Sequence, residues 1–334
     1  MIEIDGAMGE GGGQVVRTAL GLSLATQQPF RITNIRARRS TPGLRPQHVA
    51  AVRAAAAVGR AEVEAVREGT SAFTFAPTAV APGRYTFDVG TAGSAVLVQQ
   101  TVLPALLTAS APATTTVTGG THVKWAPPFD FFAASFCPLV QRMGPVLRPS
   151  LARPGFYPKG GGQCTLTVEP VATLDPLDVT ERGALRRVRA RSIVANLPRH
   201  IGERELATLR DGLPVDVDEA RIETPAALGA GNALVLQLDY EHVTVVVSRM
   251  GEQGTPAEDV AREVVDEARA YLGADAPVDS HLADQLLIPL ALGGGRFRAT
   301  TLTAHTHTNA AVIERFVGDC FSVTEADGGW LLSA

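Results

Sequence analysis

The sequence predicts an α/β (α+β) fold with one large domain and one smaller inserted α/β domain. Short apolar runs with β periodicity alternate with runs of helical periodicity along most of the chain, which is typical of layered α/β proteins. Glycine clusters at residues 9–13, 160–162 and 293–295 adjoin such β-compatible runs and indicate tight turns. With 334 residues, 45% of them hydrophobic, the chain is long enough to bury a large core.

The large domain is expected to contain amphipathic or apolar helices separated by short strands. The predicted helices span residues 15–26, 46–57, 94–109, 129–143, 283–292 and 310–316. Pro46 suits a first helical turn, and Thr308 or Asn309 is expected to cap the last helix. The predicted strands, which contain β-branched and aromatic residues, span residues 30–35, 84–89, 114–118, 163–168 and 297–302.

Residues 181–272 differ from the rest of the chain because they contain no glycine triplet and many acidic residues. Their periodicity predicts strands at residues 190–197, 233–240 and 243–248, and helices at residues 201–211 and 256–272. We therefore predict a large domain made of residues 1–180 and 273–334, with a small α/β domain, residues 181–272, inserted into it.

A short repeat indicates duplicated units within the large domain. The run Gln100-Thr-Val-Leu-Pro104 matches Gln285-Leu-Leu-Ile-Pro289 in the order glutamine, three mostly apolar residues, proline. Both runs lie in apolar segments that are expected to form helices. Strand–turn–helix units that recur within one chain are typical of repeated supersecondary modules.

Positive charge is concentrated in one segment, although the net charge is −4. Nearly all of the cationic residues are arginine, since Lys124 and Lys159 are the only lysines. The segment from 36 to 45 contains Arg36, Arg38, Arg39 and Arg45. A mildly acidic chain is poorly suited to bind polyanions along their length, so this cluster predicts a phosphate-bearing ligand held at one site. A solvated charged loop is the alternative.

The sequence contains no apolar run long enough for a transmembrane helix and no signal-peptide pattern at its start. We therefore expect a soluble, cytoplasmic protein that does not bind membranes. The three cysteines lack metal-site spacing, which suits a reducing compartment. No particular protein partner is predicted.

His305 is the residue best suited to chemistry. It follows an expected strand and a polar turn, just before the expected last helix. Backbone N–H groups and the dipole at a helix N-terminus favour a phosphate, and a neutral imidazole is nucleophilic near neutral pH. His305 is therefore a candidate covalent catalyst of phosphoryl or nucleotidyl transfer. The alternative is a histidine that only fills a surface turn.

The run Gly9-Glu10-Gly-Gly-Gly13 places one carboxylate in a turn whose backbone N–H groups can surround an anion. It lacks the Gly-Lys-Ser/Thr of a P-loop and, with Gln14 in place of the last glycine, the dinucleotide fingerprint. Glu10 can hold Mg²⁺ against phosphates, since that ion uses one or two carboxylates plus phosphate oxygens. A structural turn with an exposed glutamate is the alternative.

Together, these segments resemble the RNA 3′-terminal phosphate cyclases over nearly the whole chain. The matching motifs are Glu10-Gly-Gly-Gly-Gln14 with Arg17, Arg36-Ala-Arg38-Arg39 through His48, Thr91-Ala-Gly-Ser94 with Gln100, Gly119-Gly-Thr121 with Ala126-Pro127, Gly155-Phe-Tyr-Pro-Lys-Gly-Gly-Gly162, His281-Leu-Ala-Asp284-Gln285 and His305-Thr-His307-Thr308. The resemblance implies a large catalytic domain of three repeated modules, similar to the C-terminal domain of a translation initiation factor, with a small inserted domain.

The resemblance also implies roles for individual residues. The nucleophile falls on His305 and not on His307, because the family motif is His-x-x-Thr. The nucleotide-contacting positions fall on Gln100, Pro127, His281, Asp284 and Gln285. The metal position falls on Glu10, and the phosphate positions fall on Arg17, Arg39 and Gln47. Many members have tyrosine where this chain has His281, whose imidazole also presents a face on which a base can stack.

The implied reaction uses ATP, with Mg²⁺ or Mn²⁺, to convert an RNA 3′-terminal phosphate into a 2′,3′-cyclic phosphate. It proceeds through AMP bound covalently to His305 and then through an adenylated RNA end. Two alternatives are a non-catalytic ribosomal-RNA assembly factor of the same fold, which His305 argues against, and an enolpyruvyl transferase, which needs no nucleophilic histidine. A lysine-dependent ligase is disfavoured because neither Lys124 nor Lys159 lies in a Lys-x-Asp-Gly context.

Overall fold

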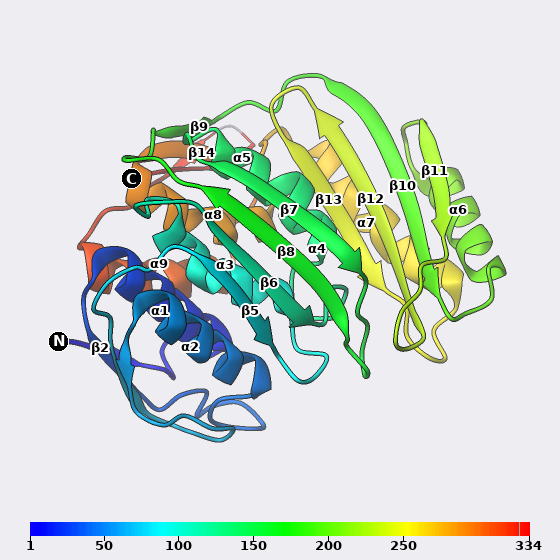
Figure 1. Cartoon of the computed structure of the whole chain (residues 1–334). Helices are drawn as coiled ribbons and strands as arrows, with labels where there is room; N and C mark the ends of the chain where they lie inside the picture. The colour runs from blue at the N-terminus through cyan, green and yellow to red at the C-terminus, as the bar shows by residue number, and fades with distance from the viewer. Residues whose placement is uncertain (327) are drawn as a thin grey trace.

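The computed structural model describes residues 1–326 and 328–334, which form a mixed α/β structure (Figure 1). Its strands are β1 (Ile2–Asp5), β2 (Phe30–Thr33), β3 (Glu62–Val63), β4 (Phe73–Ala76), β5 (Arg84–Asp88), β6 (Ala113–Gly119), β7 (Val146–Arg153), β8 (Gly162–Glu169), β9 (Leu177–Val179), β10 (Leu185–Ala195), β11 (Glu219–Glu223), β12 (Gly231–Tyr240), β13 (Thr244–Met250), β14 (Gly295–Ala299), β15 (Ser322–Ala326) and β16 (Gly329–Ser333). Its helices are α1 (Gly13–Thr26), α2 (Pro46–Gly59), α3 (Ala95–Leu106), α4 (Phe129–Phe131), the π-helical segment η1 (Phe132–Phe136), α5 (Cys137–Gln141), α6 (His200–Gly212), α7 (Ala257–Gly273), α8 (Ser280–Gly293) and α9 (Ala304–Val317).

Three of the sheets in the described residues have the same strand order and the same strand directions. Their orders are β1-β2-β4-β3, β5-β6-β8-β7 and β9-β14-β16-β15. In each sheet the first two strands run parallel, and the last strand in sequence lies antiparallel between the second and the third. The helices that precede the second and third strands are α1 and α2, then α3 and α4–α5, then α8 and α9.

The remaining sheet has the order β11-β10-β12-β13. All of its strands, together with α6 and α7, lie between β9 and α8 in the sequence. Figure 1 shows α6 and α7 behind this sheet, and the two helices pack against each other. Val260, Val264 and Ala268 recur on one face of α7 at helical spacing and are buried, because that face covers β12 and β13.

The helices near the candidate site are buried on most faces because they pack against one another as well as against a sheet. In α3, every residue except Gln100 is buried. Ser94 caps this helix by accepting a hydrogen bond from the Leu97 N–H at 3.2 Å. Gln100 and Gln285 occupy equivalent places, each five residues after the first residue of its helix (95 to 100 and 280 to 285). Their likeness in sequence therefore corresponds to a likeness in position.

Each helix and strand predicted from the sequence is present, with ends shifted by a few residues. The sequence did not indicate several short or edge strands, namely β1, β3, β4, β7, β9, β11, β15 and β16. Most of these have at most five residues, too few to show an alternating pattern. The longer β7 contains Pro149 and lies at the edge of its sheet, where exposed residues obscure the alternation.

The predicted cap of the last helix was wrong. The helix begins at Ala304 and is capped by Thr303, whose hydroxyl accepts from the Thr306 N–H at 3.3 Å. The Thr306 hydroxyl in turn accepts from the Thr303 N–H at 3.2 Å, which completes a reciprocal capping pair. Thr308 lies inside the helix and donates to the Ala304 carbonyl at 2.8 Å. His305 is therefore part of the first helical turn and does not precede it.

None of the helices in the described residues is both long and apolar enough to cross a membrane. The three cysteines are free thiols, with Cys137 and Cys164 buried and Cys320 partly exposed. Burial raises the pKa of the Cys164 thiol to about 12, so this side chain packs as an apolar group.

Candidate active site

The first turn of α9 meets the glycine-rich loop that leads from β1 into α1. Glu10 in the loop donates its backbone N–H to Thr308 Oγ1 at 3.3 Å, a contact between residues 298 positions apart. This contact brings Glu10 beside His305, the second residue of α9. Two helices thus begin close together, and their free N–H groups favour an anion between them.

The imidazole of His305 is oriented through one nitrogen. Nδ1 is hydrogen-bonded to Gln14 Oε1 at 3.2 Å and lies 2.8 Å from Glu10 Oε2. Both neighbours can only accept, so the proton of the neutral ring belongs on Nδ1 and the lone pair on Nε2. The side chain of His305 is 53% exposed, and no described residue hydrogen-bonds Nε2. Nε2 is therefore available to a ligand.

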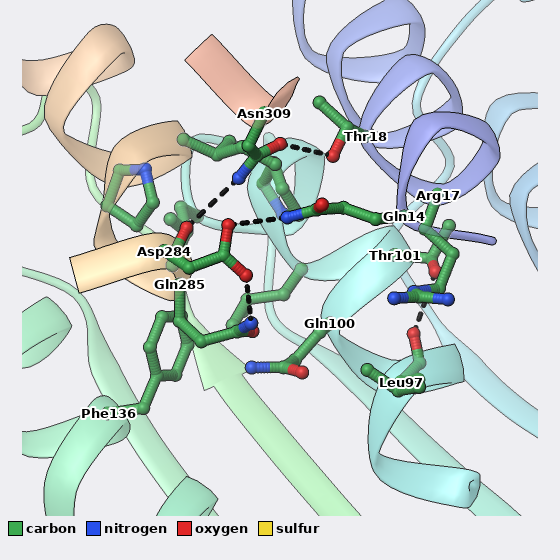
Figure 2. A pocket seen from close by; sticks show the side chains of 15 residues that line it. Gln14, Arg17, Thr18, Leu97, Gln100, Thr101, Phe136, Asp284, Gln285 and Asn309 are labelled. Atoms are coloured by element: carbon green, nitrogen blue, oxygen red, sulfur yellow. Dashed lines mark hydrogen bonds between the residues drawn. The ribbon is translucent and has the colours of Figure 1, made fainter. Parts of the chain in front are cut away.

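A chain of hydrogen bonds fixes the amide of Gln14 (Figure 2). Gln14 Nε2 donates to Asp284 Oδ1, so Gln14 Oε1 is turned toward His305. The other carboxylate oxygen of Asp284 accepts from Gln285 Nε2 at 3.0 Å. The Asp284 carbonyl accepts from Asn309 Nδ2 at 3.0 Å, which ties α8 to α9. The tautomer of His305 therefore depends on groups from three helices.

A cavity of about 60 Å³ adjoins this hydrogen-bonded chain (Figure 2). Its lining comes mainly from α1, α3 and α8: Gln14, Arg17, Thr18, Leu97, Gln100, Thr101, Leu103, Pro104, Leu107, Phe136, Asp284, Gln285, Ile288, Pro289 and Asn309. Both amide atoms of Gln100 are buried and have no hydrogen-bond partner among the described residues. Because an unpartnered buried amide is costly, it indicates a place for a ligand with a donor and an acceptor.

The charges at this cavity act in a partly desolvated space. Burial raises the pKa of the Asp284 carboxyl, while the nearby His305, the hydrogen bond from Gln14 and the charge of Arg17 lower it. Burial lowers the pKa of Arg17 to about 10, against the opposing effect of Asp284. Arg17 therefore stays cationic at neutral pH, and its charge is less screened than on an open surface.

Glycine allows the loop to approach α9 and α2 closely. A Cβ at Gly9, which has φ +52°, would lie 2.1 Å from Thr308 Oγ1. A Cβ at Gly13 would lie 2.0 Å from His48 Nε2. His48 is buried, and burial together with nearby arginines lowers its pKa to about 3, so the ring is neutral. Its Nδ1 accepts from the Arg45 N–H at 3.0 Å, which leaves an Nε2–H donor beneath the start of α1.

Two of the clustered arginines serve the loop itself. Arg36 donates to the Gly43 carbonyl at 3.1 Å, and Arg45 pairs with Glu68. Arg39 is exposed and has no hydrogen bond or ion pair within residues 1–326 and 328–334. The cluster predicted from the sequence therefore divides into two structural members and two exposed arginines, Arg38 and Arg39, that have no partner among the described residues.

Arg39 and Gln47 lie against the loops that begin α1 and α3. Arg39 Nη2 is 3.3 Å from the position that a Cβ of Gly12 would take. Gln47 Oε1 accepts from the Ser94 N–H at 3.0 Å. The two phosphate-binding positions predicted from the sequence thus border the same glycine-rich turn as Glu10.

Two predicted nucleotide-contacting residues are not among those that line the cavity. His281 lies in the first turn of α8, where its side chain is 72% exposed and its Nε2 is 3.8 Å from Glu267 Oε1. Pro127 lies in the segment between β6 and α4. The structure brings together Gln100, Asp284 and Gln285 in the lining of the cavity, whereas His281 and Pro127 are not part of that lining.

The described residues contain no group of three or more His, Cys, Asp or Glu side chains that could hold a metal. Glu10 Oε2 is nevertheless buried and has no hydrogen bond of suitable direction in this part of the chain. A single such carboxylate oxygen fits Mg²⁺, which is usually bound by one or two carboxylates together with phosphate oxygens. Glu10 therefore fits as the protein ligand of an ion that arrives with a phosphate-bearing ligand.

Sequence reasoning missed two residues that organise the site. Gln14 was read only as part of a motif, although it lies three residues before Arg17 and hence on the same face of α1. Asn309 was expected to cap the helix, whereas its Oδ1 accepts from Thr18 Oγ1 at 2.6 Å and its amide holds α8. No local pattern could reveal the second role, because its partners lie on distant helices.

Comparison with known proteins gives consistent similarity along the chain. A family model described as RNA 3′-terminal phosphate cyclase matches residues 8–323. A Ralstonia nicotianae protein named RNA 3′-terminal phosphate cyclase is 52% identical over 318 residues, which covers 95% of this chain and 91% of that protein. Proteins of the same name are 47% identical in Koribacter versatilis, with 98% and 93% covered, and 45% identical in Salmonella agona, with 98% and 95% covered. The matched range contains every residue of the site described above.

Proposed function

This chain belongs to the RNA 3′-terminal phosphate cyclase family, and on that premise we propose that it uses ATP to convert an RNA 3′-terminal phosphate into a 2′,3′-cyclic phosphate. The observation that carries the proposal is the unpartnered Nε2 of His305 at the start of α9, with Nδ1 held by acceptors. A side chain with this arrangement is an oriented nucleophile and not a turn filler.

In the first step, Nε2 of His305 attacks the α-phosphorus of ATP. The Nε2–P bond forms, the bond from this phosphorus to the bridging oxygen breaks, and pyrophosphate leaves. Nδ1 keeps its proton, so the ring becomes cationic while it carries AMP. Glu10, 2.8 Å from Nδ1, and the Gln14 oxygen at 3.2 Å offset that charge as it develops.

In the next steps the activated AMP moves to the RNA. An oxygen of the RNA 3′-phosphate attacks the phosphorus of the histidine-bound AMP and releases the imidazole. The neighbouring 2′-hydroxyl then attacks the RNA phosphorus, closes the 2′,3′-cyclic phosphate and expels AMP. Activation is required because an unactivated phosphate has no acceptable leaving group, whereas the adenylated phosphate does.

The cavity supports a position for the adenine base of ATP. The unpartnered amide of Gln100 supplies a donor and an acceptor, and the amide of Gln285 lies nearby (Figure 2). His281 and Pro127 are proposed to contact the base from outside this cavity.

Arg17, Arg39 and Gln47 are proposed to bind phosphate groups, with the glycine-rich turn between them. The proposed role of Arg39 is supported by two observations: it has no ion-pair partner in the described residues, and it lies beside Gly12. Glu10 would hold Mg²⁺, or Mn²⁺, together with phosphate oxygens. When bound, the ion would neutralise part of the phosphate charge.

The direct test is to incubate the protein with ATP labelled at the α-phosphate and to follow two products. We expect a protein-bound label that is stable in alkali and lost in acid, as for a phosphoramidate. We also expect conversion of an RNA 3′-phosphate to a cyclic end. A ribosomal-RNA assembly factor or an enolpyruvyl transferase would form neither product, so the absence of both would contradict the proposal.

We predict that Arg39→Ala lowers the efficiency of 3′-phosphate cyclisation about 10- to 100-fold, the scale of a lost charge-assisted contact to phosphate. The measurement is kcat/KM for an RNA 3′-phosphate at saturating ATP. Arg67→Ala is the matched control, because Arg67 is also exposed and forms no ion pair in the described residues. Equal behaviour of the two variants would show that Arg39 belongs only to a solvated face.

We predict that Gln14→Ala slows self-adenylation about 10- to 100-fold, the usual cost of removing a group that orients a reacting imidazole. Gln14 is a positioning residue, so the change should appear in the rate of the step and not in the KM for ATP. Gln27→Ala at the other end of α1 is the control, since Gln27 only contacts the Leu24 carbonyl. A purely structural role of Gln14 would instead lower the melting temperature with an unchanged rate per folded molecule.

We also propose the finer domain organisation. Residues 1–180 and 273–334 form the catalytic domain of three repeated modules resembling the C-terminal domain of a translation initiation factor, and residues 181–272 form the inserted domain. The common strand order of three sheets supports the repeat, and the position of the elements β10 to α7 between β9 and α8 supports the insertion. The inserted domain interrupts one module between β9 and α8. The remaining elements of that module follow the same order as the elements of the other two modules.

A further inference from the structure

An exposed aromatic side chain lies at the end of the second sheet where β5, β6 and β7 finish and β8 begins. Tyr157, in the loop that joins β7 to β8, is 79% exposed. Gly119 at the end of β6 pairs with Gly162 at the start of β8, so the loop that follows β6 and the loop that precedes β8 lie at the same end. This is the lower end of β6 and β8 in Figure 1.

The loop holds Tyr157 outward on a well-packed base. Phe156 is buried and its ring stacks on His122, with ring centroids 5.6 Å apart. The Gly160 N–H donates to the Phe156 carbonyl at 2.7 Å, and Arg153 Nε donates to the Gly161 carbonyl at 2.5 Å. Because its neighbours are fixed, the exposed ring of Tyr157 is presented by the loop and is not part of a loose segment.

The same loop carries a cation, and an apolar side chain of another loop packs against this loop. Lys159 is exposed and forms no ion pair in the described residues, whereas the other lysine, Lys124, pairs with Glu252. Leu228, from the loop between β11 and β12, is 67% exposed. It faces the same loop, because a Cβ at Gly161 would lie 2.1 Å from Leu228 Cδ1. We call Tyr157, Lys159 and Leu228 the platform.

Direct contacts connect the platform with the phosphate-binding part of the site. A Cβ at Gly160 would lie 2.7 Å from the Thr91 carbonyl oxygen. Two residues after Thr91, a Cβ at Gly93 would lie 2.8 Å from Cβ of Gln47. Gln47 is one of the residues proposed above to bind phosphate, and His48 next to it touches the start of α1. The loop that carries Tyr157 and Lys159 therefore packs against the loop before α3, which in turn packs against Gln47.

We infer that the platform holds the nucleotides of a single-stranded RNA that precede its 3′-terminal phosphate. This inference rests on the proposed function, and it assigns RNA contacts outside the reacting centre. An exposed aromatic ring with a nearby unpaired cation is the combination that binds single strands, because any base can stack on the ring while the cation meets the backbone. Leu228 extends the apolar surface under a second base.

The test compares two RNA 3′-phosphates: a dinucleotide, and a single strand of about 20 nucleotides that exceeds the length such a surface covers. For wild type we expect the longer RNA to have the higher kcat/KM. Tyr157→Ala should lower kcat/KM for the longer RNA roughly 5- to 100-fold, mainly through KM, as expected for loss of one stacked base. The same variant should leave dinucleotide cyclisation and self-adenylation unchanged. Tyr157→Phe should retain wild-type behaviour, because the ring remains.

Two further variants complete the design. Lys159→Ala should lower use of the longer RNA several-fold and make its salt dependence shallower, since one phosphate contact is lost. Trp330→Ala on β16 is the control for a partly exposed aromatic residue, and it should change neither substrate.

Three outcomes would overturn the inference. Equal losses on both RNAs for Tyr157→Ala would mean that the loop supports only the reacting centre. Unchanged use of both RNAs by Tyr157→Ala and Lys159→Ala would mean that the platform does not bind RNA and would suggest a protein partner as its ligand. A wild type that forms the histidine adduct but cyclises neither RNA would overturn the proposed function as well, which distinguishes that failure from the first two.

Discussion

His305→Ala is expected to abolish ATP-dependent labelling of the protein, with a loss of at least about 10⁴-fold, the scale on which removal of a catalytic nucleophile acts. The reason is geometric. Nε2 of His305 is the atom left without a partner in the described residues, while Nδ1 is hydrogen-bonded to Gln14 and lies 2.8 Å from Glu10 Oε2. The nearby His48 is not suited to replace it, because the lone pair on its Nδ1 accepts from the Arg45 N–H and its Nε2 carries the proton.

The measurement is the amount of acid-labile AMP bound after incubation with α-labelled ATP. His307→Ala is the matched control, since His307 lies two residues further along α9, and it should retain at least part of the labelling. His305→Ala should also fail to cyclise RNA 3′-phosphates. If an RNA end adenylated in advance is supplied, the variant should still close the ring, because His305 acts before that step. Equal labelling of wild type and His305→Ala would rule out the covalent mechanism.

The second large effect concerns the chemistry of the RNA end. An RNA 3′-phosphate should be cyclised, and an otherwise identical RNA 3′-hydroxyl should give no product, because it offers no phosphate to be activated. A DNA 3′-phosphate should accumulate as the adenylated end, since it has no 2′-hydroxyl to displace AMP. Gel separation of labelled ends distinguishes the cyclic end, the adenylated end and the unreacted end. Efficient turnover of a 3′-hydroxyl RNA would contradict the proposed function.

The same experiment should show how many phosphates the protein contacts. The net charge is −4, Arg36 is engaged with a carbonyl of its own loop and Arg45 is paired with Glu68, so the arginine cluster keeps few cations for RNA. The logarithm of affinity should therefore fall shallowly with the logarithm of salt concentration, with about 0.7 per phosphate contacted on a single strand. A steep dependence would indicate binding along a long tract and not recognition of the end.

The sequence alone was enough to determine the family, because membership depends on short motifs, but it did not indicate the roles of Gln14 and Asn309 in the candidate site. The strand–helix alternation and the glycine-rich turn before α1 were predicted for the same reason, since both follow from local periodicity and composition. His305 was recognised because its motif lies next to the start of a helix. The predicted start of α9 was wrong. Thr303, Thr308 and Asn309 are all suitable N-cap residues by local preference, and the reciprocal hydrogen bonds of Thr303 with Thr306 place the start at Ala304.

Only the tertiary structure decided how these residues act. The contact of Gln14 with Asp284 joins residues 270 positions apart, and that of His305 with Gln14 joins residues 291 positions apart. Arg36 and Arg39 look equivalent in the sequence, but only the structure shows that they differ. Arg36 donates to the Gly43 carbonyl, whereas Arg39 does not take part in such a contact in the described residues. Such contacts arise from the packing of α1, α8 and α9, and packing depends on the whole chain. A local pattern can therefore predict that the reacting group is the imidazole of His305. Which ring nitrogen carries the proton, and which one is available to a ligand, depend on neighbours that only folding brings close.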